Sequence, residues 1–404
     1  MIVGAGPTGA SMALLLARQG LPVVLVEASR EPSRRFRGEA LMPHGLAALA
    51  AMGLWPLPAT IPQKPLAGWR FVVDRLELFR LDEPLESPSS QGCTLISQPA
   101  FLRHLVGQLE ALPSATVLLG RRVQGLEWRG ERVAGVRLAD GSLLESALVV
   151  AADGRSSLLR QQAQLRLAQQ GNPFDLLWFQ LQSPEPSPLG GLFTTMVGPE
   201  GLCSVFEAAE GSLQIGWVRP TSGGDGTPQD WLERLVAQSP ADLAPWWRQQ
   251  GSGLGQPTPL RVEVGHVESW WRPGLLLLGD AAHPMSPVRA QGINLALRDA
   301  WTAAQELIPL LQAAPHQAQP PLEPALARIE ALRRGEVTSL QNQQAQETRR
   351  GQLLLEQPRL RQLLGRGAPW IGGLVARRWR HDQRQLRQGV TNLTPQAGRP
   401  GNDG

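Results

Sequence analysis

Six residues at the start of the chain have the types and spacing of a dinucleotide-binding turn. They read Gly4-Ala5-Gly6-Pro7-Thr8-Gly9, after a short apolar run and before a predicted helix. Small residues let the backbone approach a pyrophosphate, which binds N–H groups at the positive end of the helix dipole. Glu27 follows Gly9 by 18 residues, at the end of the next predicted strand, where a carboxylate accepts hydrogen bonds from ribose hydroxyls. The spacing therefore predicts a dinucleotide site that uses Gly4, Gly6, Gly9 and Glu27.

Two further motifs place a carboxylate at the end of an apolar strand. Asp153-Gly154 follows the run 149–152, a pattern that also fits a plain strand ending in a turn. Gly279-Asp280 follows the run 275–278, and Gly292-Ile293-Asn294 then opens a predicted helix. A carboxylate in this position can hold a sugar-like hydroxyl, and the N–H groups of the helix can hold a second electron-rich group.

The motifs need a sheet to position them, and the hydrophobic pattern predicts one. Residues 2–30 indicate a βαβ unit, residues 43–52 and 99–112 indicate helices, and residues 116–151 indicate strands with a hairpin turn at 140–141. Only three residues precede Gly4, whereas a strand usually has about five or six, so we expect either a truncated sequence or a start upstream of Met1.

A second layer of different architecture follows. Four alternating apolar runs, at 175–182, 191–197, 202–207 and 213–218, have no helix between them, which predicts an antiparallel meander. The Trp/Phe-rich stretch 69–81 also alternates like a strand. A helix at 229–238, a return strand at 260–267 and a buried strand at 274–279 complete the pattern.

We expect an α/β fold with a Rossmann-like nucleotide domain, an inserted antiparallel β-sheet substrate domain and a C-terminal helical arm. The expected divisions are residues 1–70, 95–165 and 260–310 for the first domain, 71–94 and 166–259 for the second, 311–388 for the helical arm and 389–404 for a disordered tail.

Composition excludes several classes of protein. The 404 residues are 42% hydrophobic and 18% charged, and two cysteines form neither a disulfide framework nor, with histidine, a zinc site. We expect a cytoplasmic location, since no leader or long apolar segment is evident, and no metal. The net charge is +4, with no tyrosine and a single lysine, Lys64. The basic character therefore reflects arginine and predicts no nucleic-acid partner.

All three motifs occur in the order found in the p-hydroxybenzoate hydroxylase-like group A flavoprotein monooxygenases, and residues 1–310 resemble that family. The resemblance implies FAD as the cofactor, NAD(P)H as co-substrate and a small-molecule substrate. It implies that the first motif and Glu27 bind the ADP half of FAD. The other implied cofactor residues are Arg37 near the cofactor, Gln98 at its middle, Asp153 and Gly154 for pyrophosphate and pyridine nucleotide, Gly279 and Asp280 for the ribityl and ribose region, and Pro287, Gly292, Ile293 and Asn294 around the isoalloxazine ring.

The implied chemistry is reduction of FAD by NAD(P)H, capture of O2 as a flavin C4a-hydroperoxide, and hydroxylation or epoxidation of a small aromatic or apolar substrate under the meander sheet. The chain departs from the family in two respects. It has no tyrosine to deprotonate a phenol, so His, Arg, backbone or water must act instead. Arg289 stands in a loop that is usually Gly-rich, so we name Arg289 and Pro287 as candidate catalytic residues, against a plain loop arginine that points to water or pairs with Asp299 or Glu306.

Two other functions stay open. A flavin-dependent reductase or dehydrogenase, of the prenyl-chain reductase kind, would use the same cofactor frame without O2. A non-catalytic FAD-binding protein would show no reduction by pyridine nucleotide. A halogenase is disfavoured, because no Trp-x-Trp-x-Ile-Pro string is present.

Four other features have both a structural and a functional interpretation. His44 reads as a surface histidine at a helix start rather than a proton relay, and His283 as structural. Trp178 or Trp217 could wall the pocket or pack in the core. Residues 328–388 hold 13 arginines against 5 acidic residues. Within them the basic amphipathic stretch 370–387 could contact an anionic membrane, or could pack on its own domain with a solvated arginine face.

Overall fold

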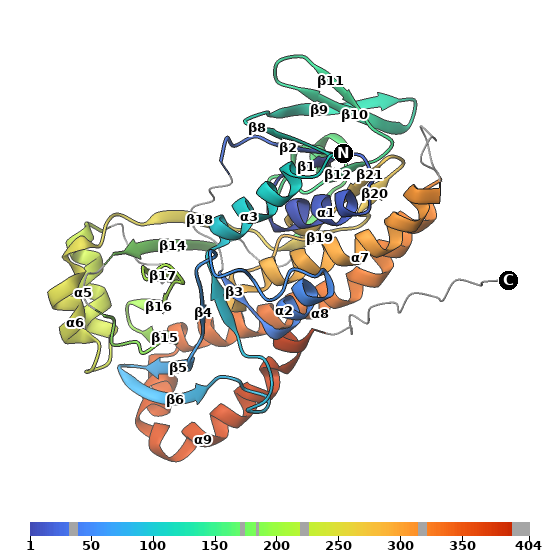
Figure 1. Ribbon diagram of the computed structural model, residues 1–404. Helices are drawn as coiled ribbons and strands as arrows, with labels where there is room; N and C mark the ends of the chain where they lie inside the picture. The colour runs from blue at the N-terminus through green and yellow to red at the C-terminus, as the bar shows by residue number, and fades with distance from the viewer. Residues whose placement is uncertain (32–38, 170–173, 183–185, 219–225, 314–320, 390–404) are drawn as a thin grey trace.

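Two large β-sheets with long helices between and beside them build the molecule (Figure 1). The computed structural model describes residues 1–31, 39–169, 174–182, 186–218, 226–313 and 321–389. Arg37 and most of the tail therefore lie outside the described residues.

The first sheet has six strands in the order β20-β21-β12-β1-β2-β8. They are β20 (Trp271–Arg272), β21 (Leu275–Leu277), β12 (Val149–Ala151), β1 (Ile2–Val3), β2 (Val23–Glu27) and β8 (Ala115–Leu119). All neighbours except β20 and β21 pair in parallel. Because parallel strands end at one edge, the loops after β1, β12 and β21, which carry the three motifs, meet there.

Alternating side chains cover both faces of this sheet. Leu25, Val150 and Leu276 pack among helices on one face, where the neighbours are α1 (Pro7–Arg18), α2 (Pro43–Ala51), α3 (Gln98–Glu110) and α7 (Gln291–Ala313). Val26, Val149 and Leu275 point the other way, toward a three-stranded sheet of β9 (Val123–Arg129), β10 (Arg132–Leu138) and β11 (Leu143–Glu145). The same alternation holds for β1 although it has only two residues: Ile2 packs on the helix side and Val3 on the side of the three-stranded sheet.

The second sheet has seven strands in the order β18-β14-β17-β16-β15-β5-β6. They are β18 (Thr258–Val262), β14 (Phe174–Leu181), β17 (Leu213–Val218), β16 (Gly201–Glu207), β15 (Leu192–Gly198), β5 (Gly68–Val73) and β6 (Leu76–Asp82). One face packs on α5 (Pro228–Gln238) and α6 (Ala244–Gln250), seen at the left of Figure 1, through residues such as Phe179, Trp217 and Trp231. Side chains on the other face line a cavity.

The strand order corrects the predicted meander. Only β15, β16 and β17 follow one another as a meander, and β14 pairs with β17 instead of β15. β15 pairs in parallel with β5, from much earlier in the chain. The divisions expected at residues 70 and 260 fall inside β5 and β18, so this sheet extends from residue 68 to residue 262.

Three small strand pairs and short helices connect the two sheets. β3 (Ala40–Leu41) and β4 (Gln63–Pro65) flank β7 (Thr94–Ile96), and β13 (Leu167–Gln169) pairs with β19 (Gly265–Val267). The short helices are α4 (Leu158–Gln162), η1 (Gly251–Gly253), η2 (Gly279–Ala281) and η3 (Val288–Ala290).

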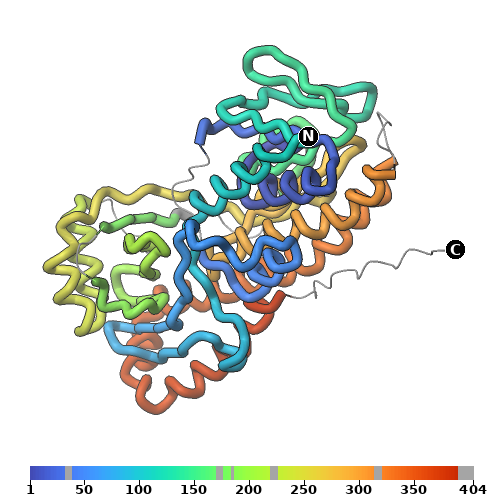
Figure 2. The backbone as a smooth tube through the Cα atoms, in the orientation of Figure 1, coloured from blue at the N-terminus to red at the C-terminus, as the bar shows by residue number. Residues whose placement is uncertain are grey.

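The C-terminal region is helical, as predicted. α8 (Glu323–Glu356) packs along α7, and α9 (Pro358–Gln388) turns back beneath β5 and β6, as the tube in Figure 2 shows. Side chains of α9, including Trp379, pack against Trp69, Phe71 and Phe79 of these strands. α9 is therefore the outer cover of the edge of the second sheet.

Candidate active site

A large cavity lies where the motif loops, the second sheet and α8 and α9 face one another. Its volume is about 1120 Å³. Gly6 and Thr8 line one end, the aromatic side of the sheet lines the middle, and residues of α8 and α9 line the other end. The cavity thus combines a dinucleotide-type loop with an apolar chamber.

The glycine turn after β1 is packed so closely that it requires its glycines. Gly4 has φ +102°, and a Cβ at Gly9 would lie under 3.0 Å from the carbonyl oxygen of Gly4. Gly6 precedes α1 with Pro7 at its first turn, so the free N–H groups of α1 face the cavity. This cradle fits a pyrophosphate.

We expect Gly9→Ala to abolish retention of FAD, because the new methyl group must displace backbone of the cradle. The measurement is FAD per chain in purified protein. Gly107→Ala is the matched control, since that glycine lies inside α3 with nothing within 4 Å of the new Cβ. The control should keep FAD and gain about 0.5–1 kcal/mol of stability. Normal FAD content in Gly9→Ala would contradict the assigned cradle.

Glu27 supports this turn with both of its oxygens. Oε2 accepts a hydrogen bond from the N–H of Ala5 at 2.8 Å, and Oε1 accepts one from the N–H of Ser29 at 2.9 Å. The carboxylate is therefore placed at the end of β2 beside the turn, and its contact with a ribose stays a prediction.

The Asp-Gly and Gly-Asp loops are linked by arginines. Arg155 Nε donates to Asp280 Oδ2 at 3.2 Å, and both residues line the cavity together with Gly154. Arg160, which is buried, donates to the carbonyl oxygens of Ala281 and Arg155 at 2.9 and 2.8 Å. The spacing suggested no such link, because its partners are more than a hundred residues apart.

Asp153 and Gly279 shape the loops rather than lining the cavity. Asp153 Oδ2 accepts from the N–H of Leu159 at 3.2 Å, and burial raises the pKa of its carboxyl group. Gly279 has φ +60°, and a Cβ there would lie under 3.0 Å from Thr8 Oγ1. The first and third motifs thus pack against each other as well as sharing an edge.

The start of α7 provides the predicted residues beside the flavin region. Pro287, Gly292 and Ile293 line the cavity. Asn294 is buried and acts as a clamp: Nδ2 donates to the carbonyl oxygens of Ala40 and Ala290 at 3.1 and 2.7 Å, and Oδ1 accepts from the N–H of Met42 at 2.9 Å. Its side chain therefore ties the loop to β3.

Two polar side chains at the cavity wall have unused capacity. Gln98, at the start of α3, is buried with Oε1 lacking a hydrogen-bond partner. Glu39, which sequence reasoning missed, also lines the cavity with Oε2 unpartnered; burial and the nearby Glu210 raise its pKa to about 7. Glu39 can therefore exchange a proton near neutral pH.

Arg289 occupies an unexpected setting. Its side chain is only 8% exposed, and Nη2 donates to Glu347 of α8 at 3.0 Å. The guanidinium carbon lies 4.6, 5.6 and 5.7 Å from the ring centroids of Trp379, Trp69 and Phe71. The expectation that it points to water or pairs with Asp299 or Glu306 was wrong, because those carboxylates pair with other arginines of α8.

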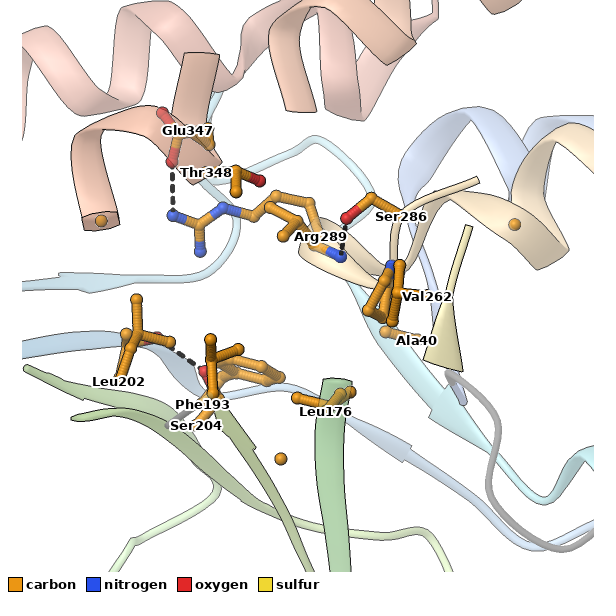
Figure 3. A pocket seen from close by; sticks show the side chains of 18 of the residues that line it. Ala40, Leu176, Phe193, Leu202, Ser204, Val262, Ser286, Arg289, Glu347 and Thr348 are labelled. Atoms are coloured by element: carbon orange, nitrogen blue, oxygen red, sulfur yellow. Dashed lines mark hydrogen bonds and ion pairs between the residues drawn. The ribbon is translucent and has the colours of Figure 1, made fainter. Parts of the chain in front are cut away.

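Arg289 also contributes to the lining of the chamber. Nε is buried without a hydrogen-bond partner, and the residue lines the cavity. Figure 3 shows the guanidinium between Glu347 on one side and Leu202, Phe193 and Ser204 of the sheet on the other. Its backbone has φ +60°, a left-handed conformation that a non-glycine residue adopts at some cost. The site thus fixes a cation above an apolar floor.

The floor is aromatic and carries few polar groups. Trp178, Phe193 and Phe206 line it, and the two phenylalanine rings stack at 5.2 Å. Trp178 Nε1 donates to Gln214 Oε1 at 2.7 Å, which satisfies its one donor. Trp217 lies on the opposite face against α5, so of the two tryptophans only Trp178 walls the pocket.

Behind the site is a buried charge cluster that sequence reasoning missed. Arg333 donates to Asp299 at 2.8 Å and to Glu336, which also accepts from Arg298 at 2.9 Å. Asp299 in turn accepts from the N–H of Gly279 at 3.1 Å and lies 2.6 Å from His283 Nε2. The cluster therefore connects α7 and α8 to the Gly-Asp loop.

His44 lies in the interior, contrary to the expected surface position. It is 1% exposed, and burial together with Arg298 lowers its pKa to about 3. It is therefore uncharged at neutral pH, because α2 packs on α7 over it.

Within the described residues, no group of His, Cys, Asp and Glu is arranged to bind a metal ion. No helix in that part of the chain combines the length and apolar character that a membrane crossing requires.

A glycine cradle at a parallel-sheet edge, two linked acidic loops and an aromatic chamber beneath a second sheet define a flavin-dependent oxidoreductase of the aromatic hydroxylase class. The chain belongs to the FAD binding domain family, whose model matches residues 1–318. It is an FAD-dependent monooxygenase that takes electrons from NAD(P)H.

Relatives with assigned activities support this class. The chain is 34% identical to 6-methylpretetramide 4-monooxygenase of Streptomyces rimosus over 75% of this chain and 73% of that protein. It is 27% identical to a ubiquinone hydroxylase of Rhodospirillum rubrum over 83% and 77%. The fold alone is shared with the structure of p-nitrophenol 4-monooxygenase from Pseudomonas putida DLL-E4, which matches with a TM-score of 0.78 at 20% identity and covers 97% of this chain and 98% of that one.

Proposed function

We propose that the enzyme hydroxylates or epoxidises a flat, mostly apolar aromatic molecule that carries an acidic oxygen. The observation that carries this proposal is Arg289, a buried cation with an unpartnered donor above the aromatic floor of the cavity. The ring system of the substrate packs on the floor that Trp178, Phe206 and Phe193 form, and its oxygen accepts hydrogen bonds from the guanidinium.

The described cavity residues are suited to binding and ionising the substrate, while the redox chemistry belongs to the cofactor. FAD, when bound, supplies the acceptor for hydride from NAD(P)H and the activation of O2. The chain has no tyrosine, and no histidine, lysine or cysteine is among the described cavity residues. A guanidinium stays protonated and cannot act as a base, so Arg289 favours ionisation of a substrate hydroxyl by stabilising its anion, while Glu39 or water takes the proton.

The predicted cofactor contacts form part of the same proposal. Gly4, Gly6 and Gly9 hold the pyrophosphate, with Glu27 toward the ribose. Gln98, Asp280 and the start of α7 hold the middle and the ring of FAD, and Asp153 and Gly154 act toward the pyridine nucleotide. Arg37 stays a candidate outside the described residues. For location, we propose the cytoplasm with peripheral contact to a membrane.

We expect oxidation of NADH or NADPH by the FAD-loaded enzyme to depend on O2 and to insert one atom of labelled O2 into an accepted hydroxynaphthalene or hydroxyanthraquinone. Rates with and without O2, and the product mass, measure this. Substrate turnover without O2 would favour the second candidate, a reductase. This candidate is supported by the 26% identity to a menaquinone reductase of Mycolicibacterium smegmatis over 76% of this chain. Absence of pyridine-nucleotide oxidation with every ligand would indicate a non-catalytic flavoprotein.

A further inference from the structure

Helix α9 packs firmly on the fold with its inner face, and its outer face carries both exposed apolar side chains and arginines. Its inner face packs on β5 and β6, where Gly372 approaches so closely that a Cβ would lie under 3.0 Å from the carbonyl oxygen of Leu78. Trp379 of the same face is buried among aromatic rings. The helix is thus positioned by the fold and does not need a partner to form.

Three large apolar side chains project from its outer face. Leu363, Trp370 and Leu374 are 69%, 83% and 71% exposed. Their spacings of seven and four residues place them on one side of a helix, opposite to the buried residues Gly365, Gly372 and Ala376. We name these three residues the α9 ridge. Tryptophan and leucine are usually mostly buried, so a ridge of this kind marks a binding surface.

Positive charge surrounds the α9 ridge. α9 contains eight arginines and one acidic residue, Asp382, which pairs with Arg350 and Arg378. The arginines that are exposed are Arg359, Arg366, Arg377, Arg378, Arg380 and Arg384. On the adjacent strand β6, Glu77 and Asp82 pair with Arg70 and Arg80. The outer face therefore repels a second copy of itself and attracts an anionic surface.

The cavity reaches the same face of the molecule. Leu374 of the α9 ridge lines the cavity, and so do Leu364, Arg350 and the exposed Arg378. An apolar molecule that leaves the chamber at this end would therefore pass Leu374 of the α9 ridge.

From the ridge, its charge and the position of the cavity mouth, we propose that α9 docks on an anionic lipid bilayer. Leu363, Trp370 and Leu374 enter the interface between headgroups and acyl chains, and the surrounding arginines contact lipid phosphates. The mouth of the cavity then faces the membrane, from which an apolar substrate can enter. This extends the proposed function by naming the surface that supplies that site, but the binding itself does not require turnover.

The test is sedimentation of the FAD-loaded, full-length protein with vesicles of phosphatidylcholine alone or mixed equally with phosphatidylglycerol. We expect binding to the mixed vesicles that weakens with added salt. Arg366→Gln with Arg377→Gln should lower the partition coefficient roughly 25-fold, at about fivefold per arginine. Leu363→Ser with Trp370→Ser should also abolish most of the binding. None of these four residues lines the cavity, so FAD content and O2-dependent NAD(P)H oxidation should not change.

The matched control is Arg129→Gln with Arg137→Gln, which removes the same charge from the exposed β9–β10 hairpin and should bind like the wild type. Equal loss in both arginine pairs would overturn the proposal, because it would show only a general charge effect. So would binding to an oligonucleotide but not to vesicles, or a dimer that the ridge substitutions dissociate. Inactive protein that still binds vesicles would count against the proposed function alone.

Discussion

Replacing Arg333 with methionine is expected to lower the free energy of unfolding by about 3–5 kcal/mol, the usual effect of removing one partner from a buried ion pair. Arg333 is buried between Asp299 and Glu336, and its loss leaves the cluster with two carboxylates and only Arg298 as a permanent cation. Because Asp299 also holds the N–H of Gly279, the Gly-Asp loop should loosen and FAD should be released more readily.

Urea unfolding followed by tryptophan fluorescence measures this change, and Arg328→Met is the matched control. Arg328 lies on the same helix but is exposed, and it pairs with Glu306 at 3.1 Å, so its loss should cost at most about 1 kcal/mol. Equal effects of the two substitutions would show that burial of the cluster is unimportant.

The same cluster predicts how the free energy of unfolding falls at low pH. Burial alone would raise the pKa of Glu336, but Arg333 and Arg298 lower it from 4.5 to about 2. A lowered folded-state pKa stabilises the fold above pH 4.5, and that contribution is lost as the pH falls toward 2. Arg333→Met should flatten this part of the stability profile.

Replacing Arg289 with glycine is expected to weaken binding of an acidic aromatic ligand by about 10- to 100-fold, as for loss of a hydrogen bond to a charged group. The change also relieves the left-handed backbone at φ +60°, so it should not prevent folding. Because it would leave the carboxylate of Glu347 with only Arg350, at 3.2 Å, as its ion-pair partner, the double substitution with Glu347→Gln separates loss of the cation from the cost of that carboxylate.

Titration of the flavin absorbance of the holoenzyme with 2-naphthoate and with its neutral isostere 2-naphthamide measures this effect. The wild type should prefer the acid, and both variants should lose that preference while they keep FAD. Parallel assays should show that NAD(P)H oxidation becomes uncoupled from substrate oxidation. A similar loss for acid and amide would mean that Arg289 serves packing and not recognition.

The sequence predicts those parts of the site that depend on local pattern. Each motif joins an apolar strand to a turn, so the positions of Gly4, Gly154 and Asp280 at one sheet edge follow from periodicity and turn chemistry. The class of cofactor is implied by the resemblance of these ordered motifs to a known flavoprotein family.

Features that depend on distant parts of the chain could not be predicted in this way. The pairing of β14 with β17 does not change the alternation of either strand, so no local signal distinguishes it from a meander. Arg289 meets Glu347, 58 residues later, only because α8 folds back over the cavity. His44 has the local context of a surface residue and becomes buried only when α2 packs on α7.

The arrangement of β1 between β2 and β12 sets the order of events during synthesis. On the ribosome, the glycine turn emerges well before its neighbours, because β12 follows only near residue 150 and β21 near residue 275. Until then the nascent chain presents unpaired apolar strand edges, which favour aggregation and engage chaperones. FAD can find its complete site only after β21 and the start of α7 have been made, so binding of the cofactor can stabilise the fold only after that point.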